Sequence, residues 1–78
     1  MLSDLPDDDP WPQERQRIGT RIRDARIHHN LTQEAVVLAI PMNRGYYQDI
    51  EAGKANPTLN TLLSIADAIG VPLADLVR

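Results

Sequence analysis

The chain has 78 residues, of which 42% are hydrophobic and 24% are charged, and it contains no cysteine. That length suits one small domain, and the composition excludes a disulfide framework, a thiolate metal site and, because no apolar run approaches roughly 20 residues, a membrane span. The N-terminus lacks the basic and apolar regions of a secretion signal, so we expect a cytoplasmic protein, and the net charge of −3 by itself argues against nucleic acid as a partner.

The acidic residues are concentrated at the N-terminus. Residues 1–9 contain four aspartates, and we expect a flexible acidic arm there, because this segment cannot bury enough apolar surface to offset its ordering entropy. Residues 10–78 carry eight positive charges against seven negative ones, and five arginines lie between Arg15 and Arg26. The acidity therefore belongs to the arm, and residues 10–78 are expected to form a near-neutral domain.

A first helix is expected to begin at Asp9-Pro10 or at Pro12, because aspartate is a good N-cap and proline is tolerated in the first turn. It is expected to run to about His29. Its apolar stripe at helical spacing comprises Trp11, Ile18, Ile22, Ala25 and His29. Glycine in a helix interior costs up to about 1 kcal/mol relative to alanine, so Gly19 is expected to mark a close contact with another element.

The second predicted helix spans about residues 33–40. Thr32 is expected to cap it by accepting a hydrogen bond from a backbone N–H of the first turn, and Pro41 cannot continue it. The run Val36–Ile40 also has the composition of a strand. The threonine cap before it and the absence of a strand to pair with favour a helix.

Three further helices follow. Asn43 is expected to cap a third helix over about residues 43–52, with Gly53 as its stop. Thr58 and Gly70 are expected to bound a fourth helix, and a fifth of barely two turns follows it. The expected apolar face of the fourth helix comprises Leu59, Leu62, Leu63, Ile65, Ala66 and Ile69. The sequence therefore predicts an all-α domain of five short helices.

Four motifs accompany these helices: Ile18-Gly19-x-x-Ile22-Arg23-x-x-Arg26, Leu31-Thr32-Gln33-Glu34, Arg44-x-Tyr46-x-x-x-Ile50-Glu51-x-Gly53-Lys54-x-Asn56-Pro57 and Leu59-x-x-Leu62-x-x-Ile65-Ala66-x-Ala68-Ile69-Gly70-Val71. In this order and spacing they resemble the XRE/Cro/C1-type helix-turn-helix family over about residues 13–78. The resemblance implies a compact lambda-repressor-like domain that binds double-stranded DNA as a transcriptional regulator, namely a repressor.

The chain departs from the family pattern at three places. Pro41 stands where the turn usually has glycine, Val37 replaces a small alanine, and Ala35 stands where an acid would complete a capping box.

The third predicted helix is expected to enter the major groove, with its N-terminal tip leading. At 100° per residue, Tyr47, Ile50 and Glu51 point inward. The candidate base-contacting residues lie at the tip or on the outward face: Asn43, Arg44, Gly45, Gln48 and Asp49. Arg44 suits the O6 and N7 of guanine and Gln48 the N6 and N7 of adenine, whereas Asp49 repels phosphate but suits the N4 of cytosine. The alternative interpretation is an ordinary solvated polar face.

Five residues are candidates for contacts to DNA phosphates: Thr32, Gln33, Tyr46, Lys54 and Asn56. The resemblance implies such a contact for Gln33, whereas Tyr46 either binds a phosphate or packs on the neighbouring loop. The resemblance also implies a structural ion pair between Arg26 of the first helix and Glu51 at the end of the third.

The adjacent His28 and His29 are the only residues that suggest a metal ion. They point about 100° apart on a helix and have no third ligand nearby in the sequence, so we expect no metal site. No nucleophile–base set and no glycine-rich phosphate loop is visible either. We therefore expect neither an enzyme nor a cofactor.

The run from Ala35 to Ile40 is apolar without interruption, which predicts a second helix buried on all sides. Leu38 and Ile27 nevertheless point away from the expected core. Either the arm formed by residues 1–9 covers them, or a partner protein does. The second case leaves open another function: a protein-interaction module of the same fold that binds a partner through the second helix and has little DNA affinity.

A homodimer is expected, because one such domain makes few base contacts and two half-sites compensate for that. Three apolar residues near the C-terminus could form its seam: Leu73, Leu76 and Val77. Their alternative role is to close the hydrophobic core.

Overall fold

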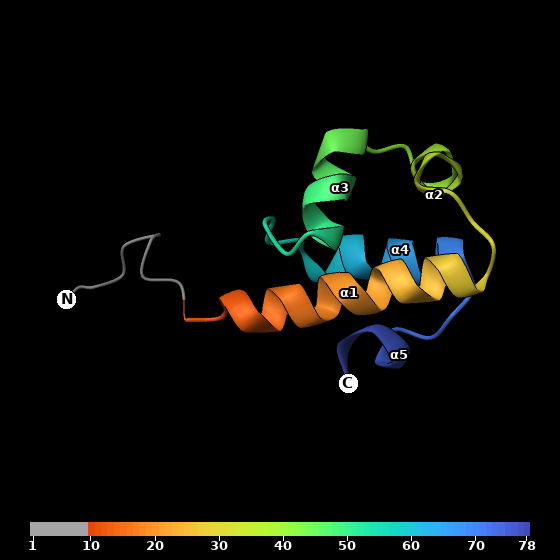
Figure 1. Ribbon diagram of the computed structural model, residues 1–78. Helices are drawn as coiled ribbons and strands as arrows, with labels where there is room; N and C mark the ends of the chain where they lie inside the picture. Colours follow the sequence, from red (N-terminus) through yellow and green to blue (C-terminus); the bar gives the residue numbers. More distant parts are fainter. Residues whose placement is uncertain (1–9) are drawn as a thin grey trace.

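The computed structural model describes residues 10–78, which form five α-helices and no strand (Figure 1). The helices are α1 (Pro12–His28), α2 (Gln33–Ala39), α3 (Arg44–Glu51), α4 (Leu59–Ile69) and α5 (Ala74–Val77). The all-α prediction is therefore confirmed, and the strand interpretation of Val36–Ile40 is wrong. The acidic arm expected over residues 1–9 lies outside the described residues.

The predicted caps of α2, α3 and α4 are present. The side-chain oxygens of Thr32, Asn43 and Thr58 each accept a hydrogen bond from the backbone N–H three residues later. At the other end of α4, Gly70 adopts a left-handed φ of 94°, a conformation that glycine reaches without steric cost. The start of α1 is different, because Trp11 is its N-cap residue and makes no side-chain cap, while Pro12 opens the helix.

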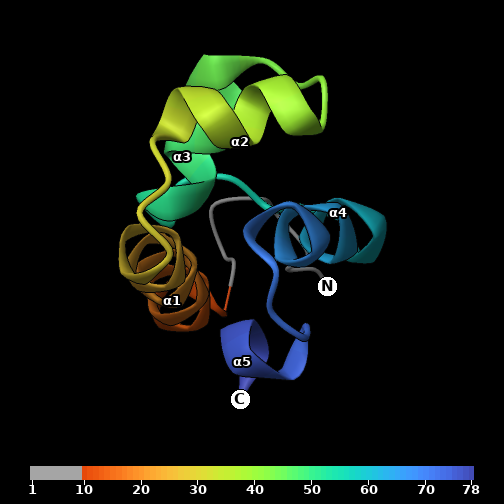
Figure 2. The same cartoon turned by 90° about the vertical axis from the view of Figure 1, so that its right-hand side faces the viewer.

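Helix α1 is the longest element and packs against α3, α4 and α5, while α2 packs against α3 and α4. The pair α2–α3 lies at one end of the molecule and α5 at the other, with α1 and α4 side by side between them (Figures 1 and 2). The core residues come from all five helices: Ile22, Val36, Val37, Tyr47, Ile50, Ile65, Ala66, Ile69 and Leu76.

Gly19 is the point of closest approach between α1 and α3. A Cβ atom at this position would lie 2.5 Å from the carbonyl oxygen of Ile50 and 2.6 Å from that of Glu51. Both atoms belong to the backbone at the end of α3, so they cannot turn aside as a flexible side chain would. The prediction that Gly19 marks a close contact is confirmed.

Several residues expected on apolar faces are exposed. Trp11 and His29 lie outside the two ends of α1, which explains why the predicted stripe does not bury them. On α4, Leu59 is 62% exposed and Leu63 is 44% exposed. The buried face of α4 is centred near Leu62 and Ile69, and Leu63 points about 100° away from it. Leu59 precedes Leu63 by one turn, on the same side of the helix.

The turn between α2 and α3 contains no left-handed residue. Helix α2 ends at Ala39, and the backbone φ of Ile40 is −126° before Pro41 continues the chain. Within residues 10–78, Asn30 is the one residue other than glycine that has a positive φ, and it lies between α1 and α2. The departure at Pro41 is thus accommodated by a turn built without the left-handed residue that glycine usually supplies.

Candidate nucleic-acid interface

Helix α3 presents one face to the core and one to solvent, as the sequence predicts. Tyr47, Ile50 and Glu51 are buried. Gly45 and Asp49 are exposed on the opposite face, and Gln48 is exposed at the edge of that face. The outward face of α3 therefore brings three of the five candidate base-contacting residues together.

Asn43 and Arg44 complete this surface at the N-terminal tip of α3. The Oδ1 atom of Asn43 caps the helix by accepting from the Tyr46 N–H at 3.0 Å, which leaves its amide NH2 group available for a ligand. Arg44 is exposed and has no ion-pair partner within the described part of the chain. The tip therefore offers a free guanidinium, the group that pairs with guanine in the major groove.

The candidate phosphate-contacting residues around this surface differ in their exposure and in their hydrogen bonds. Thr32 accepts from the Ala35 N–H at 3.0 Å, and its hydroxyl proton stays available for donation. Lys54 and Asn56 are exposed just after α3. Tyr46 is partly exposed on the flank of α3. Gln33 is half-buried and is hydrogen-bonded within the protein to Glu51 and Gln48.

The ion pair between α1 and α3 is present. Arg26 Nε lies 2.7 Å from Glu51 Oε2, and Arg26 Nη2 lies 3.2 Å from Glu51 Oε1. The remaining guanidinium nitrogen, Nη1, donates to the carbonyl oxygen of Leu31 at 2.9 Å. The side chains of Arg26 and Glu51 retain only 11% and 4%, respectively, of their accessible surface. Arg26 therefore ties the C-terminal end of α3 and the α1–α2 connection to α1.

The surroundings of Glu51 favour its ionised form. Burial alone raises the pKa of this carboxyl, but the hydrogen bond and charge of Arg26, the nearby Tyr47 hydroxyl and the hydrogen bond from Gln33 together outweigh burial, so the pKa lies below its ordinary value of 4.5. The neighbouring Tyr47 hydroxyl is buried, and no hydrogen-bond partner for it is found within residues 10–78. Burial raises the pKa of Tyr47, so this side chain stays neutral beside the ion pair.

Acid is therefore expected to destabilise the domain through Glu51. Its lowered pKa means that the stabilisation is complete above the ordinary pKa of 4.5, which applies to the unfolded chain, and is lost as the pH falls through the lower folded-state pKa. Thermal unfolding followed by circular dichroism should show a steeper loss of Tm between about pH 5 and about pH 3 in the wild type than in Glu51→Gln, which has no carboxyl to titrate. Parallel slopes in the two proteins would contradict this assignment.

The second helix is not buried on all sides, which corrects the sequence prediction. Val36 and Val37 lie in the core, but Leu38 is 73% exposed. Ile27 on α1 is 48% exposed. The reason is that α2 packs mainly against α3 and α4, which cover Val36 and Val37 and leave Leu38 uncovered. The two apolar side chains point outward as predicted, and what covers them stays a prediction.

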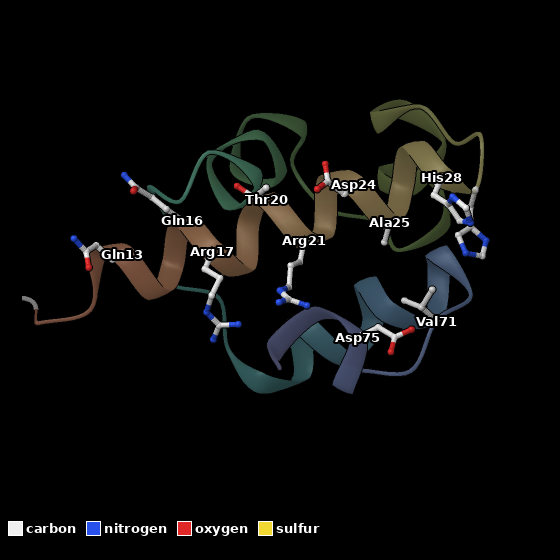
Figure 3. A pocket seen from close by; sticks show the side chains of 11 residues that line it. Gln13, Gln16, Arg17, Thr20, Arg21, Asp24, Ala25, His28, Val71 and Asp75 are labelled. Atoms are coloured by element: carbon white, nitrogen blue, oxygen red, sulfur yellow. The ribbon is translucent and has the colours of Figure 1, made fainter.

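An open groove of about 880 Å³ lies between α1 and α5 (Figure 3). It is lined mainly by polar and charged side chains of α1, with Val71 and Asp75 on the other side. Arg17 crosses it to donate to the carbonyl oxygens of Val77, at 3.1 Å, and Arg78. None of the candidate DNA-contacting residues lines this groove.

His28 and His29 lie at the end of α1, where their rings meet edge to face at 5.5 Å. Across residues 10–78, no cluster of three or more histidine, aspartate or glutamate side chains is placed to bind a metal ion. Over the same residues, none of the helices has both the length and the apolar character needed to cross a bilayer.

Comparison with known proteins decides the family. The family model for helix-turn-helix proteins matches residues 22–76, from α1 to α5. The chain belongs to the helix-turn-helix family. The matched range includes both α2 and α3, so the resemblance to the XRE/Cro/C1 type and the expected fold are confirmed.

The relatives and solved structures that this helix-turn-helix chain resembles are named as regulators. It is 38% identical over 59 residues to the cryptic phage CTXphi transcriptional repressor RstR of Vibrio cholerae, covering 76% of this chain and 53% of that protein. It is 35% identical over 60 residues to the immunity repressor of Bacillus phage phi105, covering 77% and 42%. The chain thus spans about half the length of these two relatives. The crystal structure of the restriction-modification controller C.AhdI from Aeromonas hydrophila superposes with a TM-score of 0.78 at 26% identity, covering 82% and 97%.

Proposed function

We propose that this chain binds double-stranded DNA sequence-specifically as a transcriptional regulator, with α3 in the major groove and Arg44 and Gln48 reading bases. The observation that carries the proposal is the outward face of α3, where an unpaired guanidinium and a glutamine amide stand at the tip and centre of one exposed surface. Those two groups recognise guanine and adenine, respectively, through paired hydrogen bonds. Asn43, Gly45 and Asp49 complete the base-reading surface.

Contacts to phosphates are assigned to residues on either side of α3. Lys54 and Asn56 follow α3 and supply one clamp, and Thr32, Gln33 and Tyr46 supply the other. Such contacts set the position of the helix on the duplex without reading its sequence. A domain with a net charge near +1 over residues 10–78 makes few of them, so non-specific binding is weak and depends little on salt.

The names of the relatives support a repressor rather than an enzyme. Two of them are described as repressors, one of a cryptic phage and one of a phage. By analogy with these relatives the chain acts in the cytoplasm and without a catalytic step. The protein-interaction alternative depends on the exposed Leu38 and Ile27 alone, and none of these relatives favours it.

A homodimer is also proposed, because two half-sites are needed to reach the specificity of an operator. The seam expected at the C-terminus has to be revised. Leu76 is fully buried in the core and is unavailable, while Leu73 and Val77 are half-buried. Sedimentation of the protein with and without its selected duplex measures the stoichiometry, and one protomer per duplex would contradict the dimer.

The decisive experiment is selection of bound duplexes from a random pool, followed by titration of one variant. Arg44→Ala is expected to weaken binding to the selected duplex about 10- to 100-fold, because each paired arginine–guanine contact is worth about 1–3 kcal/mol. It should also relax the base preference at one position. Arg21→Ala is the matched control, since it removes the same charge from the α5 side of the molecule. Binding of the control should change less than about twofold. If the wild type selects no duplex at about 50 mM salt, DNA binding is wrong.

A further inference from the structure

Gln33 joins a buried residue of α3 to an exposed one. Its Nε2 atom donates to Glu51 Oε1 at 3.1 Å, and its Oε1 atom accepts from Gln48 Nε2 at 3.3 Å. Gln48 and Glu51 are three residues apart on α3, so their side chains leave the helix one turn apart and about 60° apart around its axis. Gln48 lies at the edge of the exposed face and Glu51 on the buried face. Gln33, the first residue of α2, lies between them. The core ion pair is thereby connected to the outward face of α3 through one amide.

The direction of every hydrogen bond in this chain of contacts follows from its chemistry. The ionised Glu51 carboxylate only accepts, and it already holds Arg26. Gln33 must therefore turn its NH2 group toward Glu51 and its oxygen toward Gln48. Because that oxygen only accepts, Gln48 must turn its own NH2 group toward Gln33. Reversing either amide would place an oxygen against an oxygen.

These hydrogen-bond directions leave one edge of the Gln48 amide free. Its NH2 group has two protons, and Gln33 needs one of them. The other proton and the oxygen of Gln48 form a donor–acceptor pair, which is the pattern that binds the N7 and N6 of adenine. The free protein thus presents an adenine-reading edge that is already oriented, and the cost of ordering Gln48 on binding is reduced.

We propose that Gln33 is a positioning residue, which orients Gln48 for adenine through its hydrogen bond to Glu51. The inference rests on the proposed DNA binding and adds a second role for Gln33 beside the phosphate contact. Gln33 touches no base in this role. Its loss nevertheless reduces the preference for adenine at the position that Gln48 reads.

A double-mutant cycle on the selected duplex tests the inference. Affinities are measured for the wild type, Gln33→Met, Gln48→Ala and the double variant, each against duplexes with adenine or another base at the affected position. Methionine keeps the length of Gln33 without its amide, so the packing of α2 is retained. Gln48→Ala is expected to lose roughly tenfold in adenine preference, and Gln33→Met to lose most of that preference. The preference of the double variant for adenine at that position should be no smaller than the preference of Gln48→Ala alone.

The phosphate role gives a different result. If Gln33→Met weakens every duplex equally, lowers the log–log salt slope by about 0.9 and keeps the adenine preference, Gln33 acts on phosphate only and the inference is wrong. If the wild type binds no duplex, the proposed function fails and the inference fails with it.

A readout without DNA separates these cases. The side-chain NH2 protons of Gln48 are followed by NMR in the free protein, and Gln33→Met is expected to shift the proton that Gln33 holds. Asn60→Ala, a change at an exposed residue of α4, should leave these signals in place. Unchanged Gln48 signals in Gln33→Met would show that the contact does not exist in solution, and would overturn the inference whatever the DNA result.

Discussion

Replacing Glu51 by alanine is expected to destabilise the domain by about 3–5 kcal/mol, because the nearly buried guanidinium of Arg26 loses its counter-charge. The same change removes the acceptor for Gln33. A domain of 78 residues has a total stability of only about 4–12 kcal/mol, so the variant is expected to be largely unfolded at 37 °C or close to it. Each kcal/mol lowers Tm by about 4–8 °C at this size, which thermal or urea unfolding readily measures.

The control for Glu51→Ala is Glu14→Ala. Glu14 also pairs with an arginine, Arg17, at 2.7 Å, but that pair is exposed on α1. Exposed pairs contribute about 0–1 kcal/mol, so Tm should barely change. If Glu51→Ala kept the wild-type Tm and lost only DNA binding, Glu51 would belong to the interface and its structural role would be wrong.

Gly19→Ala is expected to have the second large effect on the stability of the domain. Alanine normally stabilises a helix interior relative to glycine by up to about 1 kcal/mol. Here the added methyl carbon would lie 2.5–2.6 Å from the backbone oxygens of Ile50 and Glu51, so α1 and α3 must move apart. Overpacking that forces such a backbone shift costs about 1–3 kcal/mol, so after the helix gain we expect a net loss of up to about 2 kcal/mol. Urea unfolding measures it.

Gly45→Ala is the matched control, because it makes the same change at an exposed helical position. A methyl carbon there meets one atom, the side-chain Oδ1 of Asn43, at 3.1 Å. Stability should change by less than about 1 kcal/mol in either direction. Equal losses in the two glycine variants would contradict the close approach of α1 and α3. The separation of the helices also predicts that Gly19→Ala weakens the Arg26–Glu51 pair, since the pair spans the same two helices.

The local signals in the sequence were sufficient to place the helices. A cap needs only a side chain and a backbone N–H three residues later, and a glycine stop needs only one left-handed residue. Both interactions lie within a few consecutive residues, so Thr32, Asn43, Thr58 and Gly70 were assigned correctly without tertiary information. The helical period also separated the buried face of α3 from its exposed face.

Burial at the ends and edges of helices was harder to predict, because it depends on which neighbour is in reach. Leu59 and Leu63 belong to an apolar pattern on α4 but lie beyond its packed face. Leu38 belongs to an apolar run on α2 but lies on the exposed side of that helix. The sequence left two roles open for Leu76, one in a dimer seam and one in the hydrophobic core. The packing of α5 against α1 placed it in the core.

The sequence by itself determined the number of helices, the caps of α2, α3 and α4, the helix-turn-helix spacing and the residues on the outward face of α3. Each of these follows from contacts between residues close in the chain or from the period of one helix. Only the tertiary structure decided that Gln33 bridges Glu51 and Gln48, and that Gly19 meets the backbone of α3. Those contacts join residues from 15 to more than 30 positions apart, and their geometry depends on how α1, α2 and α3 pack, which no local pattern encodes.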